Sequence, residues 1–176
     1  MADGTARRVL MTALTLWLSL GGCQRETSVD LADFKSDGCS MFPDGNYYSC
    51  CYLHDVSYWP GGTAEAREHA DKALRACVVG ITGNEALGAA MYTGVRVGGG
   101  PELPTHYRWG YGWAFPYRKD YGPLTSEEQK QVTEKTQRLC NTIRLNPSTG
   151  GFVVVISGVE REIGAAQARQ ICPGLS

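Results

Sequence analysis

The sequence predicts a mainly α-helical fold whose core is a pair of short antiparallel helices, and three observations support this prediction. Cysteine, histidine and tyrosine recur at helical spacing within residues 50–58. The turn sequence Trp-Pro-Gly-Gly at 59–62 separates this segment from a second helical pattern. Extended patterns fall in the C-terminal half, which we expect to be partly helical and partly irregular, with one short strand.

The first helix carries several chemically active side chains on one face. Cys50, His54 and Tyr58 occupy positions i, i+4 and i+8, and Cys51 and Asp55 form a second, adjacent i, i+4 pair. Two cysteines, an imidazole, a carboxylate and a phenol therefore share one broad face of this helix.

The second helix is expected from about residue 64 to residue 79, with Thr63 as its N-cap. Its inward stripe is predicted from the helical period. The stripe consists of Arg67, Asp71, Leu74, Cys77 and Val78. Asp71 is therefore a carboxylate among residues that should be buried.

A short turn makes the two helices antiparallel, and this fixes which side chains lie opposite each other. At a rise of ~1.5 Å per residue, His54 lies roughly 7 Å and Asp71 about 12 Å from the turn, close enough for a hydrogen bond between the helices. Cys50 and Cys77 both lie further from the turn and can form a disulfide. One register thus satisfies both contacts.

These residues resemble a known family. The sequence Cys-Cys-x-x-His-Asp, a tyrosine four residues after the histidine, and a helical aspartate followed six residues later by cysteine are similar to the secreted phospholipase A2 superfamily. The preceding Ser-Asp-Gly-Cys-Ser-Met-Phe-Pro-Asp at 36–44 resembles the short bacterial members more than the animal ones, whose glycine-rich calcium loop is absent. The resemblance covers residues 37–77 and implies a phospholipase A2-like core in which a calcium loop precedes the helix pair.

The resemblance implies the roles of three residues in catalysis. His54 would be the general base that takes a proton from water, Asp71 would hold the imidazole, and Tyr58 would donate a hydrogen bond to Asp71. The chemistry is consistent with these roles, because a neutral imidazole is a suitable base near neutral pH and a buried carboxylate fixes its tautomer. Water attacks the ester, so no nucleophilic side chain is required.

The resemblance also implies a bound Ca²⁺. Asp55 would hold the ion together with the preceding loop, through the Asp37 carboxylate, the Gly38 carbonyl and, by analogy with the animal loop, the carbonyls of Ser40 and Phe42. Oxygen ligands of this kind suit a hard divalent cation. The ion would neutralise the substrate phosphate and the charge that develops on the ester oxygen.

The chain contains seven cysteines, and six of them suit a disulfide framework. Six cysteines allow 15 connectivities. The resemblance implies the pairs Cys39–Cys51 and Cys50–Cys77, which leaves Cys140–Cys172. A zinc site built from Cys50, Cys51 and His54 is the alternative, and adjacent cysteines in an exported chain favour disulfides over it.

The N-terminus predicts export. Arg7 and Arg8 precede an apolar run at 9–20, which is short for a membrane span but suits the core of a signal peptide. The run ends in Leu-Gly-Gly-Cys, which resembles a bacterial lipoprotein signal with cleavage before Cys23 and lipid on its thiol. Gln24 follows in place of the aspartate that retains lipoproteins at the inner membrane, so we expect an outer-membrane anchor. An ordinary secretory signal is the alternative.

The domain organisation follows from these segments. We expect a lipoprotein signal peptide at 1–22, a polar tether at 23–36, and one domain at 37–176 with a core at 37–96 and a C-terminal extension at 97–176. The composition, with 43% hydrophobic residues, is ordinary for a globular domain. The net charge of -1 offers no basic surface for nucleic acid, and no motif indicates an obligate protein partner.

Four more elements are expected after the helix pair. Asn84 opens a helix at 85–95, and Thr125 or Ser126 caps a polar helix that ends near residue 143. A turn-rich stretch at 147–151 precedes a strand at 152–157. A last helix is expected at 160–171.

An aromatic run lies between these helices. Its members alternate with other residues and are Tyr107, Trp109, Tyr111, Trp113, Phe115 and Tyr117. The period favours an irregular extended or hairpin segment with the aromatic rings on one face. That face is either a membrane or substrate surface, since Trp and Tyr favour the headgroup zone, or a cover for the helical core.

The function expected from these residues is calcium-dependent hydrolysis of the sn-2 ester of glycerophospholipids in a membrane or lipid aggregate. His69 and His106 are expected to be solvated rather than catalytic. Two other classes remain open. One is a non-catalytic calcium-binding or lipid-binding module, and the other is a structural envelope lipoprotein in which His54 and Asp71 form a buried polar pair.

Overall fold

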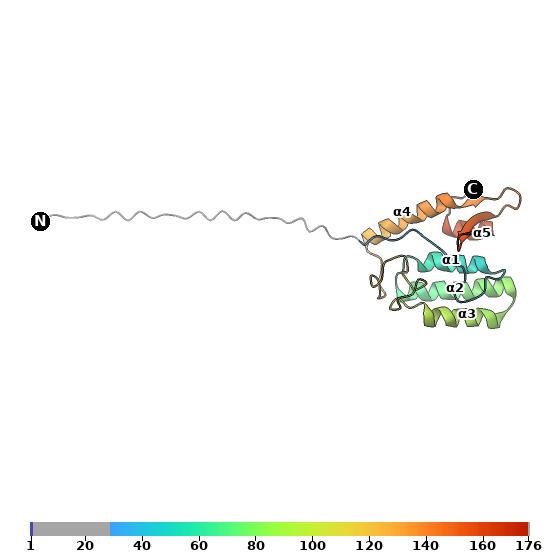
Figure 1. Ribbon diagram of the computed structural model, residues 1–176, viewed down its shortest axis with the longest axis horizontal. Helices are drawn as coiled ribbons and strands as arrows, with labels where there is room; N and C mark the ends of the chain where they lie inside the picture. The colour runs from blue at the N-terminus through green and yellow to red at the C-terminus, as the bar shows by residue number, and fades with distance from the viewer. Residues whose placement is uncertain (2–28, 176) are drawn as a thin grey trace.

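A computed structural model of the protein describes Met1 and residues 29–175, which form five helices and a three-stranded antiparallel sheet (Figure 1). The helices are α1 (Tyr48–Tyr58), α2 (Ala64–Thr82), α3 (Glu85–Gly98), α4 (Ser126–Thr142) and α5 (Ala165–Ile171), and the strands are β1 (Arg144–Leu145), β2 (Phe152–Ile156) and β3 (Val159–Ile163). The mainly helical fold is confirmed. The predicted signal peptide and Cys23 lie outside the described residues.

The antiparallel pair α1 and α2 forms as the sequence predicts. Thr63 caps α2, because its side chain accepts a hydrogen bond from the Ala66 amide at 3.1 Å. The helix ends at Thr82 and is capped by Gly83, whose φ of +66° is a conformation that glycine adopts without strain. The α3 helix then packs against α2, and in Figure 1 the three helices lie side by side in chain order.

The C-terminal half covers the opposite side of α1, which therefore lies between α2 and the sheet (Figure 1). Tyr52 of α1 is buried in a cluster with residues of β2, β3 and α5. The members with the least exposure are Tyr52, Phe152, Val154, Ile156, Ile163, Ala168 and Cys172. The helix that carries His54 is thus held from both sides.

The predicted helix at 160–171 is wrong at residues 160–163, and the helix α5 begins only at Ala165. Residues 159–163 form β3, which pairs antiparallel with β2 in the register Val154↔Arg161. Ser157 and Gly158 have φ values of +50° and +77°, and this conformation closes a two-residue hairpin. β2 supplies backbone partners along this stretch, so pairing prevails over the weak helical pattern. The described residues contain three strands where one was expected.

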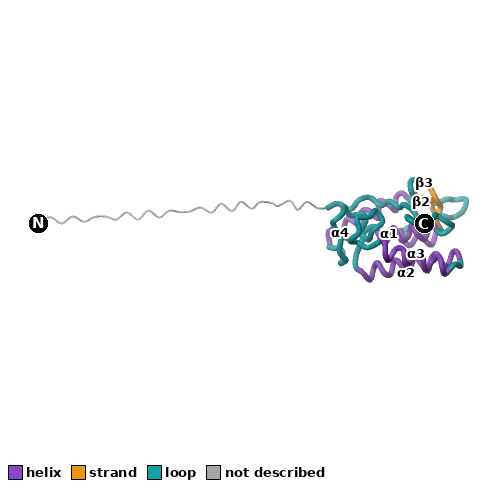
Figure 2. Tube along the Cα trace, turned by 60° about the horizontal axis from the view of Figure 1, so that its bottom comes forward, coloured by secondary structure: helices purple, strands orange, loops and turns teal. Residues whose placement is uncertain are grey.

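The aromatic run forms successive turns around Arg108 rather than an extended segment. Arg108 is 1% exposed, and its guanidinium donates hydrogen bonds to four backbone carbonyls. The acceptors are the carbonyls of Trp109, Trp113, Tyr117 and Arg118. The rings do not share one face, because Trp109 and Trp113 are buried while Phe115 and Tyr117 are exposed. The two tryptophans pack on the helix pair, at the end where the loops gather in Figure 2.

The described part of the predicted tether, residues 29–36, belongs to the folded domain. Leu31 is fully buried against Trp59 and Trp113. Its amide donates to the Gln131 side chain, and the Ala32 amide donates to the Gly112 carbonyl, both at 2.8 Å. Apolar burial therefore fixes this segment despite its polar composition. Within the described residues, no helix has the length and apolar character needed to cross a membrane.

Three disulfides are present: Cys39–Cys51 and Cys50–Cys77, the two pairs that the resemblance implies, and Cys140–Cys172, the pair that these two leave. The first links the loop before α1 to α1, the second links α1 to α2, and the third links α4 to the end of α5. The alternative zinc site is excluded in this structure, because Cys50 and Cys51 are both oxidised in these bridges.

Glu128 should make the stability of the protein pH-dependent. It is 4% exposed, and burial acts to raise its pKa. Hydrogen bonds from the Thr125 amide at 2.7 Å and from Arg118 at 2.9 Å outweigh burial and lower the pKa of Glu128 below its ordinary value. The contribution of Glu128 to stability is therefore present above the ordinary glutamate pKa and is lost as the pH falls through the lower pKa of the folded state.

We expect Glu128→Gln to lower the free energy of unfolding by about 1 to 2 kcal/mol at neutral pH, with a smaller difference from the wild type under acidic conditions. Urea denaturation at both pH values measures this difference. The matched control is Glu127→Gln, which alters an exposed residue in the same helical turn. A loss that is equal at both pH values would contradict the prediction.

Candidate active site

The centre of the site is a hydrogen-bonded pair between α1 and α2. Nε2 of His54 lies 2.8 Å from Oδ1 of Asp71, and the Tyr58 hydroxyl donates to the same oxygen at 2.6 Å. His54 is 8% exposed, Tyr58 is 2% exposed and Asp71 is fully buried. The antiparallel register that aligns Cys50 with Cys77 also aligns these three side chains, as the helical spacing predicts.

Two arginines complete the surroundings of Asp71. Arg96, near the end of α3, donates from Nη1 to Oδ2 of Asp71 at 2.7 Å. Arg67 is 3% exposed, its Nε lies 3.9 Å from the same oxygen, and it donates to the Tyr58 hydroxyl at 3.0 Å. The sequence placed Arg67 on the buried face of α2 but assigned it no role. It gave no signal for Arg96, because that contact depends on how α3 packs.

The charges of the pair suit a general base. Burial lowers the pKa of His54, against the opposing effect of its hydrogen bond with Asp71, so the ring is neutral near pH 7. Burial acts to raise the pKa of Asp71, but hydrogen bonds from His54, Tyr58 and Arg96 outweigh it and lower the pKa. Asp71 is therefore ionised and accepts the proton of Nε2, which leaves Nδ1 of His54 unprotonated.

Asp71→Asn should destabilise the fold. The carboxylate balances the buried guanidinium of Arg67 and the half-buried one of Arg96, and a neutral amide leaves these charges uncompensated. We expect the free energy of unfolding to fall by about 3 kcal/mol, as measured by chemical denaturation. Asp120→Asn, at an exposed loop position, is the control and should leave stability unchanged. A stability equal to wild type in Asp71→Asn would show that the two arginines need no counter-charge.

An apolar pocket lies beside the pair. Its wall includes His54 and Asp55 of α1 and residues from the loop before α1, from α2, from α3 and from the aromatic run. Its apolar lining includes Met41, Phe42, Leu74, Met91, Val95 and Tyr107. Gly94 and Gly98 of α3 also face the pocket. The arrangement suits an apolar group of a ligand whose polar end lies near His54.

Asp55 is a buried carboxylate with too little compensation for its charge. It is 7% exposed and accepts one side-chain hydrogen bond, from the Ser36 hydroxyl at 2.5 Å. Burial raises its pKa well above the ordinary value against the effect of that hydrogen bond, and the charges of Asp37 and Asp44 raise it further. Such a carboxylate favours a bound cation or a proton.

The loop at 36–44 folds tightly in front of Asp55. Gly38 has a φ of +79°, and a Cβ at this position would lie 2.5 Å from the Asp44 carboxylate. Asp44 accepts a hydrogen bond from the Cys39 amide at 2.9 Å, which closes the loop. The position therefore requires glycine. Asp44 is part of the loop structure, a role that the sequence analysis did not assign to it.

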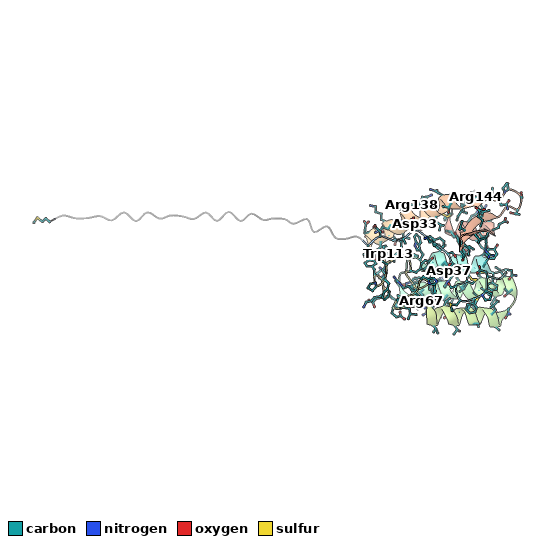
Figure 3. All side chains as sticks on the ribbon, viewed as in Figure 1. Asp33, Asp37, Arg67, Trp113, Arg138 and Arg144 are labelled. Carbon is teal, nitrogen blue, oxygen red and sulfur yellow. A yellow bond between two sulfur atoms is a disulfide. The ribbon has the colours of Figure 1, made fainter. Side chains whose placement is uncertain are left out.

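Asp37 and Ser40 lie on the exposed side of the loop. Ser40 donates to Oδ1 of Asp37 at 2.9 Å, and Nε2 of His106 lies 3.1 Å from Oδ2. Figure 3 shows Asp37 over the helical part of the molecule. His69 and His106 are both exposed, as predicted, although His106 contacts this loop.

The donor set fits a calcium ion in chemical type. Asp55 and Asp37 supply carboxylates and Gly38 supplies a carbonyl, and Asp55 lacks a positive partner. Within the described residues, no three His, Cys, Asp or Glu side chains converge on one point that could hold a metal. Backbone oxygens of the loop would therefore have to provide part of the coordination.

Comparisons with known proteins found no match to this chain among family models, curated proteins or solved structures.

Proposed function

We propose that this protein is a calcium-dependent hydrolase of the phospholipase A2 type, which cleaves the sn-2 ester of glycerophospholipids. The observation that carries the proposal is the position of the buried His54–Asp71 pair, which borders an apolar pocket that Asp55 also lines. This reaction requires three parts: a histidine base, a carboxylate that can hold a cation, and an apolar surface for part of an acyl chain.

His54 acts as the base in this mechanism. Its unprotonated Nδ1 takes a proton from a water molecule as the water oxygen bonds to the carbonyl carbon of the ester. Asp71 holds the ring through Nε2 and stabilises the imidazolium that results. The bond from this carbon to the alcohol oxygen of the lipid then breaks, and the proton moves from His54 to that oxygen. The products are a fatty acid and a lysophospholipid.

The calcium ion would be held by the Asp55 and Asp37 carboxylates together with the backbone carbonyls of Gly38 and Ser40. When bound, calcium supplies positive charge for the substrate phosphate and for the oxygen of the ester carbonyl. The Ser36 hydroxyl orients the Asp55 carboxylate toward this role. The lipid substrate presents its acyl chain to the apolar pocket and its headgroup to the loop.

The proposed location of the enzyme is the bacterial envelope. Export, followed by lipid attachment at Cys23, would hold the enzyme at a membrane surface that contains its substrate. The disulfides are consistent with an oxidising compartment of this kind. Mass spectrometry of the membrane fraction would identify the lipid on Cys23.

The test of the proposed activity is the release of fatty acid from phospholipid vesicles by the purified protein, with calcium and with a chelator. We expect release with calcium, none with the chelator, and a severe loss in Asp55→Asn. Equal release with and without calcium would overturn the calcium requirement. Calcium binding without release would make the protein a non-catalytic calcium-binding module instead.

A further inference from the structure

The hairpin formed by β2 and β3 contacts the loop at 36–44, which precedes α1. At its tip, the Ser157 amide donates to the Ser36 carbonyl at 2.9 Å. The hydroxyl of the same Ser36 donates to Asp55 at 2.5 Å. The hairpin and the buried carboxylate are therefore connected through a single residue.

A second contact joins β3 to the far end of the same loop. Nη2 of Arg161 lies 3.5 Å from Oδ2 of Asp44, whose other oxygen accepts the Cys39 amide. The Arg161 guanidinium also lies over the ring of Tyr48, 5.1 Å from its centroid. The hairpin thus contacts both ends of the loop at 36–44.

The hairpin itself is fixed to the helical core. Ile156 and Phe152 of β2 are buried with Tyr52 of α1, and the Tyr48 hydroxyl of α1 donates to the Glu162 carbonyl of β3. The hairpin is therefore packed on the helix that carries Asp55. It provides a rigid support for the loop rather than a mobile cover.

We infer that the C-terminal sheet positions the loop at 36–44 for calcium binding. Arg161 is the positioning residue for Asp44, and the Ser157 amide positions Ser36. This inference rests on the proposed function and gives the C-terminal extension a role in it. Through these contacts the sheet holds the loop carbonyls and Asp55 in place before the ion binds, which lowers the ordering cost of binding.

The sign of the effect on calcium affinity separates positioning from simple electrostatics. Arg161 carries a positive charge near a cation site, so its removal should strengthen calcium binding if charge alone matters. If Arg161 positions the loop, its removal should weaken binding, because the loop must then be ordered when the ion binds. The two explanations therefore predict opposite results.

The experiment compares Arg161→Gln with Arg144→Gln in the full-length protein. Arg144 lies in β1 of the same sheet and forms an exposed ion pair with Glu160. In Figure 3, Arg144 is at the edge of the molecule, whereas Asp37 lies over the helices. Both variants lose one positive charge. Calorimetric titration with calcium chloride measures affinity, and hydrogen exchange of the metal-free protein measures protection of the Cys39 amide.

We expect Arg161→Gln to bind calcium about threefold more weakly and to lose protection at the Cys39 amide, with Arg144→Gln unchanged in both. The two variants should have the same midpoint temperature of thermal unfolding. Unchanged or tighter calcium binding by Arg161→Gln, with the Cys39 amide still protected, would overturn the inference and leave the proposed function intact. A wild-type protein that binds no calcium would overturn the proposed function itself.

Discussion

His54→Gln should lower calcium-dependent fatty-acid release by about 10³-fold or more and leave the fold unchanged. Glutamine retains a side-chain amide that can donate to Asp71, so the buried carboxylate keeps a partner where His54 donates at 2.8 Å. It has no basic nitrogen to accept a proton from water. Fatty-acid release from phospholipid vesicles measures the loss, and circular dichroism and thermal unfolding confirm that the variant is folded.

The matched control for this experiment is His69→Gln, which alters an exposed histidine of α2. This variant should retain full activity, because His69 is not part of the hydrogen-bonded set around Asp71. Release by a folded His54→Gln variant at the wild-type rate would show that another group activates water, or that the measured hydrolysis comes from a contaminant. A wild-type protein without activity would leave His54 and Asp71 as a structural pair.

Arg108→Met should destabilise the protein by about 4 kcal/mol or more. The Arg108 side chain donates to four backbone carbonyls in the interior of the loop at 108–118. Methionine replaces the apolar stem of arginine but has no donor, so these carbonyls lose their partners while they remain shielded from water. Urea denaturation measures the change in free energy of unfolding.

Lys119→Met is the control, because Lys119 is an exposed residue next to the same loop. Like Arg108→Met, it removes one positive charge, and we expect it to change the free energy of unfolding by no more than about 0.5 kcal/mol. If Arg108→Met is folded and as stable as the wild type, the four carbonyls must find other partners. In that case the loop does not depend on the buried guanidinium, and tryptophan packing alone organises it.

The helix pair could be predicted because its signal is local. A spacing of four residues places Cys50, His54 and Tyr58 on one face of α1 whatever the rest of the chain does. A four-residue turn then leaves few possible registers for α2, and Asp71 is at the level that reaches His54. Local spacing therefore predicted the contact at the centre of the candidate site.

The contacts around this centre could not be predicted, because they join distant segments. Arg96 reaches Asp71 only after α3 packs on α2, and Arg161 reaches Asp44 across 117 residues of sequence. Neither arginine belongs to a motif. The same limit explains the misassigned segment at 160–163, where the helical pattern was weak and the strand depends on a partner in β2.

The sequence by itself determined the helix pair, the burial of Asp71 and a mainly helical fold, since these follow from helical periodicity and a short turn. The tertiary structure alone decided the shape of the aromatic loop, the packing of residues 29–36 and the support of the loop before Asp55. The physical reason is that a backbone outside helices takes its hydrogen-bond partners from elsewhere in the chain. Arg108, Gln131 and Ser157 supply those partners only once the whole domain has folded.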